Sequence, residues 1–291
     1  MNSSSRKVRL DELLKSRRFD LSQPSTTNHL SWIIWGAIGS WKTASLATLP
    51  PEMLPAFILD FDNKGLGWLR GKFSPGAVRG VSLPTQGKDG WELAGAALDR
   101  ELRGGKVPWE TLVIDSGTFA YSCALQYVLT VQKVSRMSND PKAMSADWRR
   151  YYNYTHGMFE EFLGRVRSLP CNLIVTFHET IERDDEGMIV SIHPSIPGVL
   201  HERLPGGFSE IYHSRAVKTS TETTFVWDTQ HRSRYHARTE IPSMPPTIPV
   251  DFSEVLRIRT QERKPKSARK EPKPSTSSKQ SSPSSLNPTV R

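Results

Sequence analysis

The segment from Leu30 to Thr43, LSWIIWGAIGSWKT, limits the fold of this chain more than any other part of its sequence. Its apolar first half has the length and the β-branched and aromatic content of a buried strand, and the glycines that follow favour a tight turn. A helix is expected to begin near Lys42. A strand, a glycine-bearing loop and a helix N-terminus together direct backbone N–H groups toward one point, which suits a chain of phosphates.

One residue of this segment departs from the common pattern of phosphate-binding loops, G-x-x-x-x-G-K-[ST]. Gly36, Lys42 and Thr43 match the pattern, whereas Trp41 stands where the second glycine is expected, with Gly39 nearby. If Trp41 has a positive φ, its side chain costs roughly 1–2 kcal/mol, which nucleotide binding can offset. An ordinary strand and turn, in which Lys42 and Thr43 only open a surface helix, is the alternative for this segment by itself.

The loop gives a first set of candidate residues. Lys42 would neutralise the terminal phosphates, and the Thr43 hydroxyl would bind Mg²⁺. The residues predicted to bind the nucleotide are Gly36, Ala37, Ile38, Gly39, Ser40, Trp41, Lys42 and Thr43.

Carboxylates end two further predicted strands, AFILDF and TLVIDS. Asp115 ends the second strand in the Walker B pattern, which would hold Mg²⁺ through water in line with Thr43. Asp60 and Asp62 are two residues apart, so on a strand they would face the same side, where they could polarise a water molecule or hold a metal. Solvated acids that cap a strand are the alternative for this pair in isolation.

A further buried strand, CNLIVTF, ends at His178 and Glu179. A polar side chain at this position can contact the γ-phosphate or the attacking water and so report the state of the nucleotide. A β-hairpin is expected over residues 180–193. Two or three antiparallel strands are expected to follow, at Glu210–Val217, Thr223–Asp228 and Arg234–Thr239.

The segment between these strands combines a polar loop with an aromatic helix. Lys133–Asp147 lacks periodicity and is expected to be a loop, and Trp148–Ser168 is expected to be a helix. The helix begins with WRRYYNYTH, whose bases and aromatic rings could neutralise and stack on single-stranded nucleic acid. Packing of these rings within the protein is the alternative.

The net charge of +9 is carried by the two ends of the chain. Residues 257–291 have a net charge of +8 and residues 1–20 of +3, which leaves the part between them close to neutral. The only cysteines, Cys123 and Cys171, have neither disulfide-framework nor metal-ligand spacing. Without an apolar run of ~20 residues or a signal peptide, a cytoplasmic location and no membrane association are expected.

Three regions follow from these patterns. Residues 1–29 form a basic segment in which leucines allow a short amphipathic helix, residues 30–256 form one α/β domain, and residues 257–291 form a Pro-, Ser- and Lys-rich tail expected to be disordered. The tail could tether nucleic acid electrostatically or only keep the protein soluble.

The order of a phosphate-loop strand, an acid-tipped strand, a Walker B strand and a polar-tipped strand resembles that of the RecA-like P-loop ATPases. The likeness is closest to the compact phage-encoded members of the AAA type or single-strand-annealing type. It covers residues 30–256 and rests on GAIGSWKT, FILDFDNKG, IVTFHE and ARTEIPSMPPTIPVDFSEVL. It implies a RecA-like α/β core with a mainly parallel central sheet flanked by helices, followed by an antiparallel β extension.

The resemblance also implies cofactors and roles. The cofactors would be ATP and Mg²⁺, with Thr43 and Asp115 as metal ligands. Asp62 would be the general base for the attacking water, supported by Asp60, and His178 would sense the γ-phosphate. Lys42, Asp62 and His178 are therefore the expected catalytic residues.

A function follows from the same resemblance. The protein would act on single-stranded DNA in phage-type recombination, by annealing or strand pairing, in the cytoplasm of a bacterial host. It would work as a homo-oligomer, with a single-strand-binding protein or another recombination protein as partner. Lys133–Asp147 and Glu179–Gly198 would lie at the positions that contact DNA. The sequence leaves open whether Arg234 or Arg238 reaches a neighbour's nucleotide as an arginine finger.

Two departures from the family pattern, Trp41 and an Asp in place of the usual Glu at position 62, leave other functions open. One is a module that binds nucleotide with little hydrolysis and recruits DNA or a partner. Another is an accessory ATPase of DNA packaging or replication. A small-molecule phosphotransferase is disfavoured, because no arginine-rich lid or acceptor-binding segment is evident.

Overall fold

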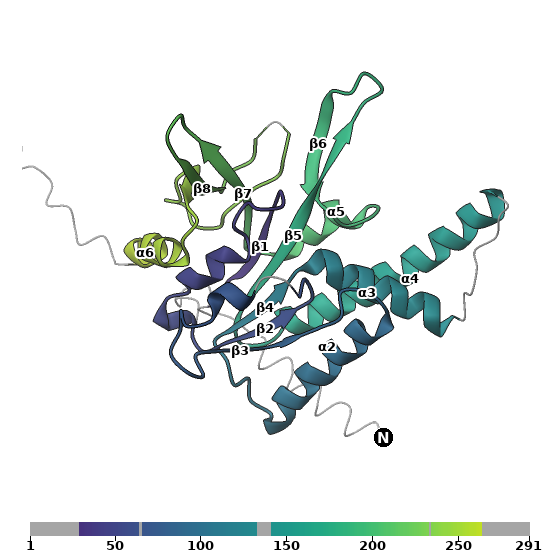
Figure 1. Cartoon of the computed structure of the whole chain (residues 1–291), viewed down its shortest axis with the longest axis horizontal. Coiled ribbons are helices and arrows are strands. Elements are labelled where there is room, and N and C mark those ends of the chain that lie inside the picture. Colours follow the sequence, from purple (N-terminus) through teal and green to yellow (C-terminus); the bar gives the residue numbers. More distant parts are fainter. Residues whose placement is uncertain (1–28, 64–65, 133–140, 233, 264–291) are drawn as a thin grey trace, which may run out of the picture.

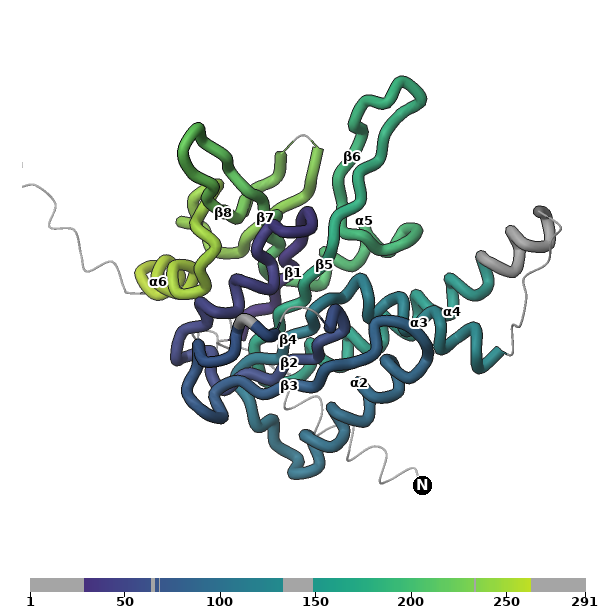
Figure 2. The backbone as a smooth tube through the Cα atoms, viewed as in Figure 1, coloured from purple at the N-terminus to yellow at the C-terminus, as the bar shows by residue number. Residues whose placement is uncertain are grey.

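The computed structural model describes residues 29–63, 66–132, 141–232 and 234–263 (Figures 1 and 2). The predicted N-terminal helix and the tail beyond residue 263 lie outside these ranges. Most of the loop predicted at 133–147 lies outside them as well. Residues 141–147, which we predicted as loop, belong instead to a helix that begins at Pro141, because proline is well suited to the first position of a helix.

A nine-stranded sheet in the order β3-β2-β4-β5-β1-β7-β8-β9, with β6 paired to β5, forms the centre of the molecule. The strands from β3 to β7 in this order are all parallel to their neighbours. They are β1 (Ser31–Gly36), β2 (Ala56–Asp60), β3 (Val78–Ser82), β4 (Thr111–Asp115), β5 (Asn172–Arg183) and β7 (Glu210–Lys218). The predicted mixed α/β fold with a mainly parallel sheet is confirmed.

Antiparallel strands extend this sheet in two places. β6 (Ile189–Pro194) returns along β5 as the predicted hairpin, which projects away from the sheet in Figure 1. β8 (Thr223–Asp228) and β9 (Thr247–Pro249) continue the sheet beyond β7. The third strand of the extension is therefore β9. The strand predicted at Arg234–Thr239 does not form, and this segment makes only isolated β-bridges, such as that between Ile211 and Arg238.

Both faces of β1, β2, β4 and the first half of β5 are buried, which explains their nearly continuous apolar sequences, whereas the edge strand β3 is partly exposed. In β1, Ile33 and Trp35 face a core shared with α2 and α3, whereas Trp32 and Ile34 face a second core shared with α6. The helices on the first face are α2 (Lys88–Glu101), α3 (Gly117–Val131) and α4 (Pro141–Arg167), seen together in Figure 1.

Short helices and a final long helix complete the fold. α6 (Phe252–Arg263) buries Phe252 and Ile258, so ordered structure continues past residue 256, where the sequence placed the end of the domain. No helix in the described part of the chain has the length and apolar character needed to cross a membrane. The short helices are η1 (Ala44–Thr48), η2 (Pro51–Met53), η3 (Leu66–Leu69), η4 (Leu102–Gly104), α5 (Leu200–Arg203) and η5 (Leu204–Gly207).

The helix predicted after the phosphate-binding loop is only the five-residue 3₁₀ helix η1. Two features explain its form. The Ser45 hydroxyl donates a hydrogen bond to the Lys42 carbonyl at 2.6 Å, which competes with the α-helical backbone pattern. Pro50 and Pro51 then lack the N–H groups needed to continue the helix. The loop consequently receives less support from a helix dipole than the sequence suggested.

Candidate functional site

Lys42 lies at the centre of the loop that follows β1. Its side chain is buried, and its Nζ donates hydrogen bonds to the carbonyls of Gly36 at 2.8 Å and Ala37 at 2.6 Å. Burial lowers the pKa of Lys42 to about 8, although the negative charges of Asp115, Glu179 and Asp62 act in the opposite direction. The loop therefore holds an ammonium group next to several carboxylates.

Three positions of the loop, Gly36, Gly39 and Trp41, have backbone conformations that side chains disfavour. Gly36 has a φ of 155°, and a Cβ at this position would lie 2.1 Å from the carbonyl oxygen of Ser214 on β7. Trp41 has a φ of 68°, so the residue at the second glycine position does adopt the strained conformation considered above. Its indole stacks on Phe225 of β8, with ring centroids 4.7 Å apart and an interplanar angle of 16°.

Asp115 ends β4 next to the loop and is held by two hydroxyl groups. Thr43 Oγ1 donates a hydrogen bond to Asp115 Oδ2 at 2.8 Å, and Thr176 Oγ1 donates to Oδ1. The side chain is only 1% exposed, and burial raises the pKa of Asp115 to about 6. Among the described residues no cation lies within ion-pair distance of this carboxylate, so its direct donors are neutral hydroxyl groups and the Lys42 ammonium acts on it from farther away.

The pair of Thr43 and Asp115 fits a magnesium ion by the chemistry of its atoms. Mg²⁺ prefers oxygen ligands and commonly takes one or two from the protein and the others from phosphates and water. The neighbouring Ser116 hydroxyl is buried and has no hydrogen-bond partner among the described residues. Within the same residues, no group of three or more His, Cys, Asp or Glu side chains is arranged to hold a metal ion.

Asp60 and Asp62 take different positions, contrary to the expectation that they share one side. Asp60 Oδ1 accepts a hydrogen bond from the Asn63 backbone N–H at 2.8 Å, and Oδ2 accepts one from the Ser82 hydroxyl at 3.3 Å. The difference arises because β2 ends at Asp60, so strand alternation does not extend to Asp62. Asp60 thus fixes the turn that presents Asp62.

Asp62 and His178 face each other across the site. The distance from Asp62 Oδ2 to His178 Nε2 is 3.9 Å. The His178 backbone N–H donates a hydrogen bond to the Thr118 hydroxyl at 3.0 Å, and its ring meets the edge of Phe119, both at the start of α3. α3 therefore fixes the orientation of the histidine.

These residues line a single pocket of about 230 Å³. Nine predicted residues from four separate segments meet there, together with Ala44, Ser116 and Thr176, which the sequence analysis missed. Of the predicted loop residues, Gly36 and Ala37 do not line the pocket and instead bind Lys42 through their carbonyls. The predicted residues that line it are Ile38, Gly39, Ser40, Trp41, Lys42, Thr43, Asp62, Asp115 and His178.

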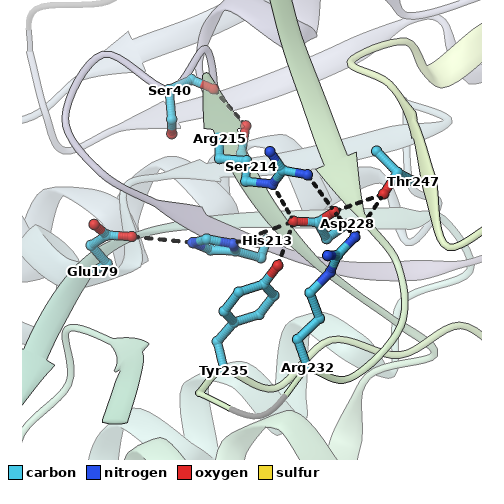
Figure 3. Close-up of polar contacts among 9 residues, drawn as sticks. All are labelled: Ser40, Glu179, His213, Ser214, Arg215, Asp228, Arg232, Tyr235 and Thr247. Atoms are coloured by element: carbon cyan, nitrogen blue, oxygen red, sulfur yellow. Dashed lines mark hydrogen bonds and ion pairs between the residues drawn. The ribbon is translucent and has the colours of Figure 1, made fainter. Parts of the chain in front are cut away.

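A second polar cluster, also missed by the sequence analysis, lies on β7 and β8 beside the loop (Figure 3). His213 lies between Glu179, at 3.2 Å from its Nε2, and Asp228, at 3.9 Å from its Nδ1. The adjacent Ser214 hydroxyl donates to the Ser40 carbonyl at 2.5 Å. Finding these contacts requires knowing that β7 pairs with β1, which no local pattern indicates.

Asp228 is the centre of this cluster. Its fully buried carboxylate accepts hydrogen bonds from Arg215 Nε at 2.5 Å and from Tyr235 Oη at 2.5 Å. Thr247 Oγ1, at 2.8 Å, and Arg232 Nη2, at 3.2 Å, also donate to it. Burial by itself would raise the pKa of Asp228, but hydrogen bonds from Arg215, Tyr235 and Thr247 outweigh it and lower the pKa to about 2.

The two candidate arginine fingers differ in their surroundings. Arg238 Nη2 donates a hydrogen bond to the Phe208 carbonyl at 2.5 Å, and its backbone pairs with Ile211 of β7. Arg234 is exposed.

Residues 28–241 match the family model of an AAA domain. The chain belongs to this AAA-domain family. The match spans the loop, Asp62, Asp115 and His178, and it supports nucleotide binding and hydrolysis by the core of this AAA-domain protein. No curated protein matches the chain.

Two solved structures similar to this AAA-domain protein share little of its sequence. The flagellar accessory protein FlaH from Methanocaldococcus jannaschii is 10% identical, with a TM-score of 0.42, over 75% of this chain and 83% of FlaH. The RadB recombinase is 14% identical, with a TM-score of 0.35, over 70% of this chain and 82% of RadB.

Proposed function

We propose that this AAA-domain protein is a Mg²⁺-dependent ATPase of the RecA-like type that acts on single-stranded DNA. The observation that carries the first part is the meeting of Lys42, Thr43, Asp62, Asp115 and His178 around one pocket. If the loop were an ordinary strand and turn, we would not expect it to meet polar residues from the β2 turn, β4 and β5. That arrangement combines a cation for phosphates, oxygen ligands for Mg²⁺ and a carboxylate for water.

Each residue has a role that its surroundings support. Lys42 would neutralise the terminal phosphates, and the Thr43 hydroxyl and Asp115 would hold Mg²⁺, which would draw negative charge away from the phosphate oxygens. Asp62, a partly exposed carboxylate facing His178, would orient the attacking water and take its proton. His178, fixed by α3, would respond to the terminal phosphate.

The test is phosphate release from ATP in the presence of Mg²⁺. Lys42→Ala and Asp62→Asn should each lower turnover by at least about 100-fold, the usual range for loss of a general base or of charge stabilisation. Glu92→Gln, on the exposed side of α2, is the matched control and should keep the wild-type rate. Unchanged hydrolysis by Lys42→Ala would reject the site assignment.

The proposed contact with single-stranded DNA rests on α4. Arg149 and Arg150 are exposed there, and the Arg150 guanidinium lies 5.8 Å from the ring centroid of Tyr154, which is 52% exposed. A base and an exposed ring of this kind can neutralise phosphates and stack on bases. The tip of the β5–β6 hairpin is less suitable, because Asp184, Asp185 and Glu186 would repel phosphates.

DNA binding is tested by ATP turnover with and without single-stranded DNA at two salt concentrations. Stimulation should weaken as salt rises, because phosphate contacts release counterions. The double variant Arg149→Ala with Arg150→Ala should lose most of the stimulation, whereas Arg257→Ala on α6 should keep it. Stimulation that survives the α4 changes but disappears on deletion of residues 264–291 would assign DNA binding to the tail.

We place this activity in phage-type recombination, by annealing or strand pairing, in a homo-oligomer that meets other recombination proteins in the cytoplasm. Light scattering with and without ATP would test assembly. The second candidate is the same core binding nucleotide with little turnover, which the strained Trp41 and the short helix η1 favour. A turnover stimulated several-fold by single-stranded DNA would exclude it.

A further inference from the structure

Trp41 combines two features that rarely occur together in a binding loop. Its φ of 68° is a conformation in which glycine would be free of strain, and a bulky side chain there is a clear outlier. The indole is nevertheless 49% exposed, so its burial does not account for the strain. Strained residues of this kind concentrate at functional sites, where a ligand makes use of the side chain.

The surroundings hold the indole in one orientation. One face of the ring stacks on Phe225 of β8 at 4.7 Å. The hairpin that carries Phe225 is tied to the same loop by the hydrogen bond from Ser214 to the Ser40 carbonyl at 2.5 Å. The backbone of Gly36 also packs against Ser214. Trp41 is therefore a fixed aromatic surface rather than a freely rotating side chain.

The position of Trp41 follows from the order of the strands. Asp62, Asp115 and His178 lie on the β2, β4 and β5 side of β1, whereas Phe225 lies on the opposite side, beyond β7. If the terminal phosphate lies among the carboxylates and His178, the rest of a nucleotide runs toward β8. The pocket of about 230 Å³ is smaller than the ~300–1,000 Å³ of common small-molecule sites, so the base must lie at its rim.

We propose that Trp41, supported by Phe225, is the surface on which the base of the bound nucleoside triphosphate stacks. This inference rests on the proposed phosphate site and adds the residue that binds the other end of the ligand. A glycine at position 41 would avoid the unfavourable φ, whereas the tryptophan provides an aromatic contact with the base. Base–aromatic stacking commonly contributes ~1–3 kcal/mol per base, which corresponds to about 5-fold to 150-fold in affinity.

The test compares two ligands that share the phosphates and differ in the base. Calorimetry would measure the affinities of ATP and of inorganic tripolyphosphate, both with Mg²⁺, for the full chain and its variants. Trp41→Ala should weaken ATP binding about tenfold and change tripolyphosphate binding less than twofold. Trp41→Phe should keep most of the ATP affinity, and Phe225→Ala should lose part of it.

Trp41→Gly separates stacking from strain. This variant removes the ring but also removes the unfavourable φ, so its loop should hold tripolyphosphate at least as well as the wild type. Its ATP affinity should still fall about tenfold. Wild-type ATP affinity in Trp41→Gly, or equal losses of both ligands in Trp41→Ala, would overturn the inference.

Failure of the phosphate site gives a different pattern. If Lys42→Ala leaves the affinities of both ligands unchanged, the proposed phosphate site is wrong, whatever the results for the Trp41 variants. A wild type that binds neither ligand overturns both proposals. A second measurement supports the calorimetry. The tryptophan emission that Trp41→Phe removes should be quenched by ATP and unaffected by tripolyphosphate, and an equal response to both would contradict stacking.

Discussion

Asp115 and Asp228 are the same residue type at the same kind of position, the end of a strand, and both are buried. Asp115 receives hydrogen bonds from two neutral hydroxyl groups, whereas Asp228 is bound by two guanidinium groups, a phenol and a hydroxyl. Burial raises the pKa of Asp115 to about 6 despite its two hydroxyl donors, whereas hydrogen bonds led by that from Arg215 outweigh burial and lower the pKa of Asp228 to about 2. Burial is common to both, so the charge of the neighbours decides the difference.

Asp115 can therefore bind a cation, whereas the charge of Asp228 is already compensated by its guanidinium partners. Asp115 receives hydrogen bonds only from neutral hydroxyl groups, and it lies beside the pocket, where the Lys42 ammonium acts on it through space. Asp228 instead fastens β7, β8 and β9 to the segment around Tyr235. We therefore expect substitutions of Asp115 to affect activity and substitutions of Asp228 to affect stability.

The largest expected effect concerns ATP turnover. Asp115→Asn should lower the Mg²⁺-dependent rate by at least about 100-fold, because the amide binds Mg²⁺ poorly. Asp228→Asn, assayed where circular dichroism shows it to be folded, should stay within about tenfold of the wild type. Equal losses in the two variants would remove the functional distinction between them.

The free energy of unfolding should depend on Asp228 rather than on Asp115. Asp228→Asn should lower the free energy of unfolding by about 2 kcal/mol, since it removes the charge that strengthens the hydrogen bonds from the partly exposed Arg215 and Arg232. Asp115→Asn should be neutral or stabilising at pH 8, because it removes an ionised carboxylate that burial disfavours. Urea denaturation in the presence of a chelator measures both. A large loss of stability in Asp115→Asn would show that its charge is structurally compensated.

The Asp228 contribution should also depend on pH. Because its pKa is lowered from 3.8 to about 2 in the folded protein, its ionised form stabilises the fold above about pH 4. That contribution should be lost as the pH falls toward 2, so the stability difference between wild type and Asp228→Asn should shrink over this range. Urea titrations at a series of pH values provide the measurement, and a constant difference down to pH 2 would contradict the role of the carboxylate charge.

The smallest effects come from single donors on each carboxylate. Tyr235→Phe removes one hydrogen bond to Asp228 and should cost about 1–2 kcal/mol of stability with little change in turnover. Thr176→Val removes one hydrogen bond to Asp115 and should change turnover several-fold. Unfolding and turnover measured on both variants would show whether the two effects separate. If Tyr235→Phe lowers turnover as much as Thr176→Val does, the two clusters act as one.

The comparison also shows which parts of the site a sequence can reveal. β1, β2, β4 and β5 were predictable because parallel strands buried on both faces have continuous apolar sequences. Asp115 was found because it ends such a strand, and Lys42 because it follows a recognisable loop. In each case the signal lies within a few consecutive residues.

The rest depends on contacts between distant segments. Asp228 also ends a predicted strand, but its partners come from β7, β9 and the segment around residue 235. The pairing of β7 with β1, which brings Ser214 to Ser40, is set by packing rather than by a local pattern. Trp41 lies between these cases, because the sequence marks it as irregular but only the structure gives its φ and its contact with Phe225.

The most direct test of the Asp115 site is electron paramagnetic resonance of Mn²⁺, used in place of Mg²⁺, titrated with the protein and ATP. Wild type and Asp228→Asn should each bind one Mn²⁺ per chain, and only when nucleotide is present. Asp115→Asn should bind it at least about tenfold more weakly. Wild-type Mn²⁺ affinity in Asp115→Asn would contradict the assignment of this carboxylate to the metal site.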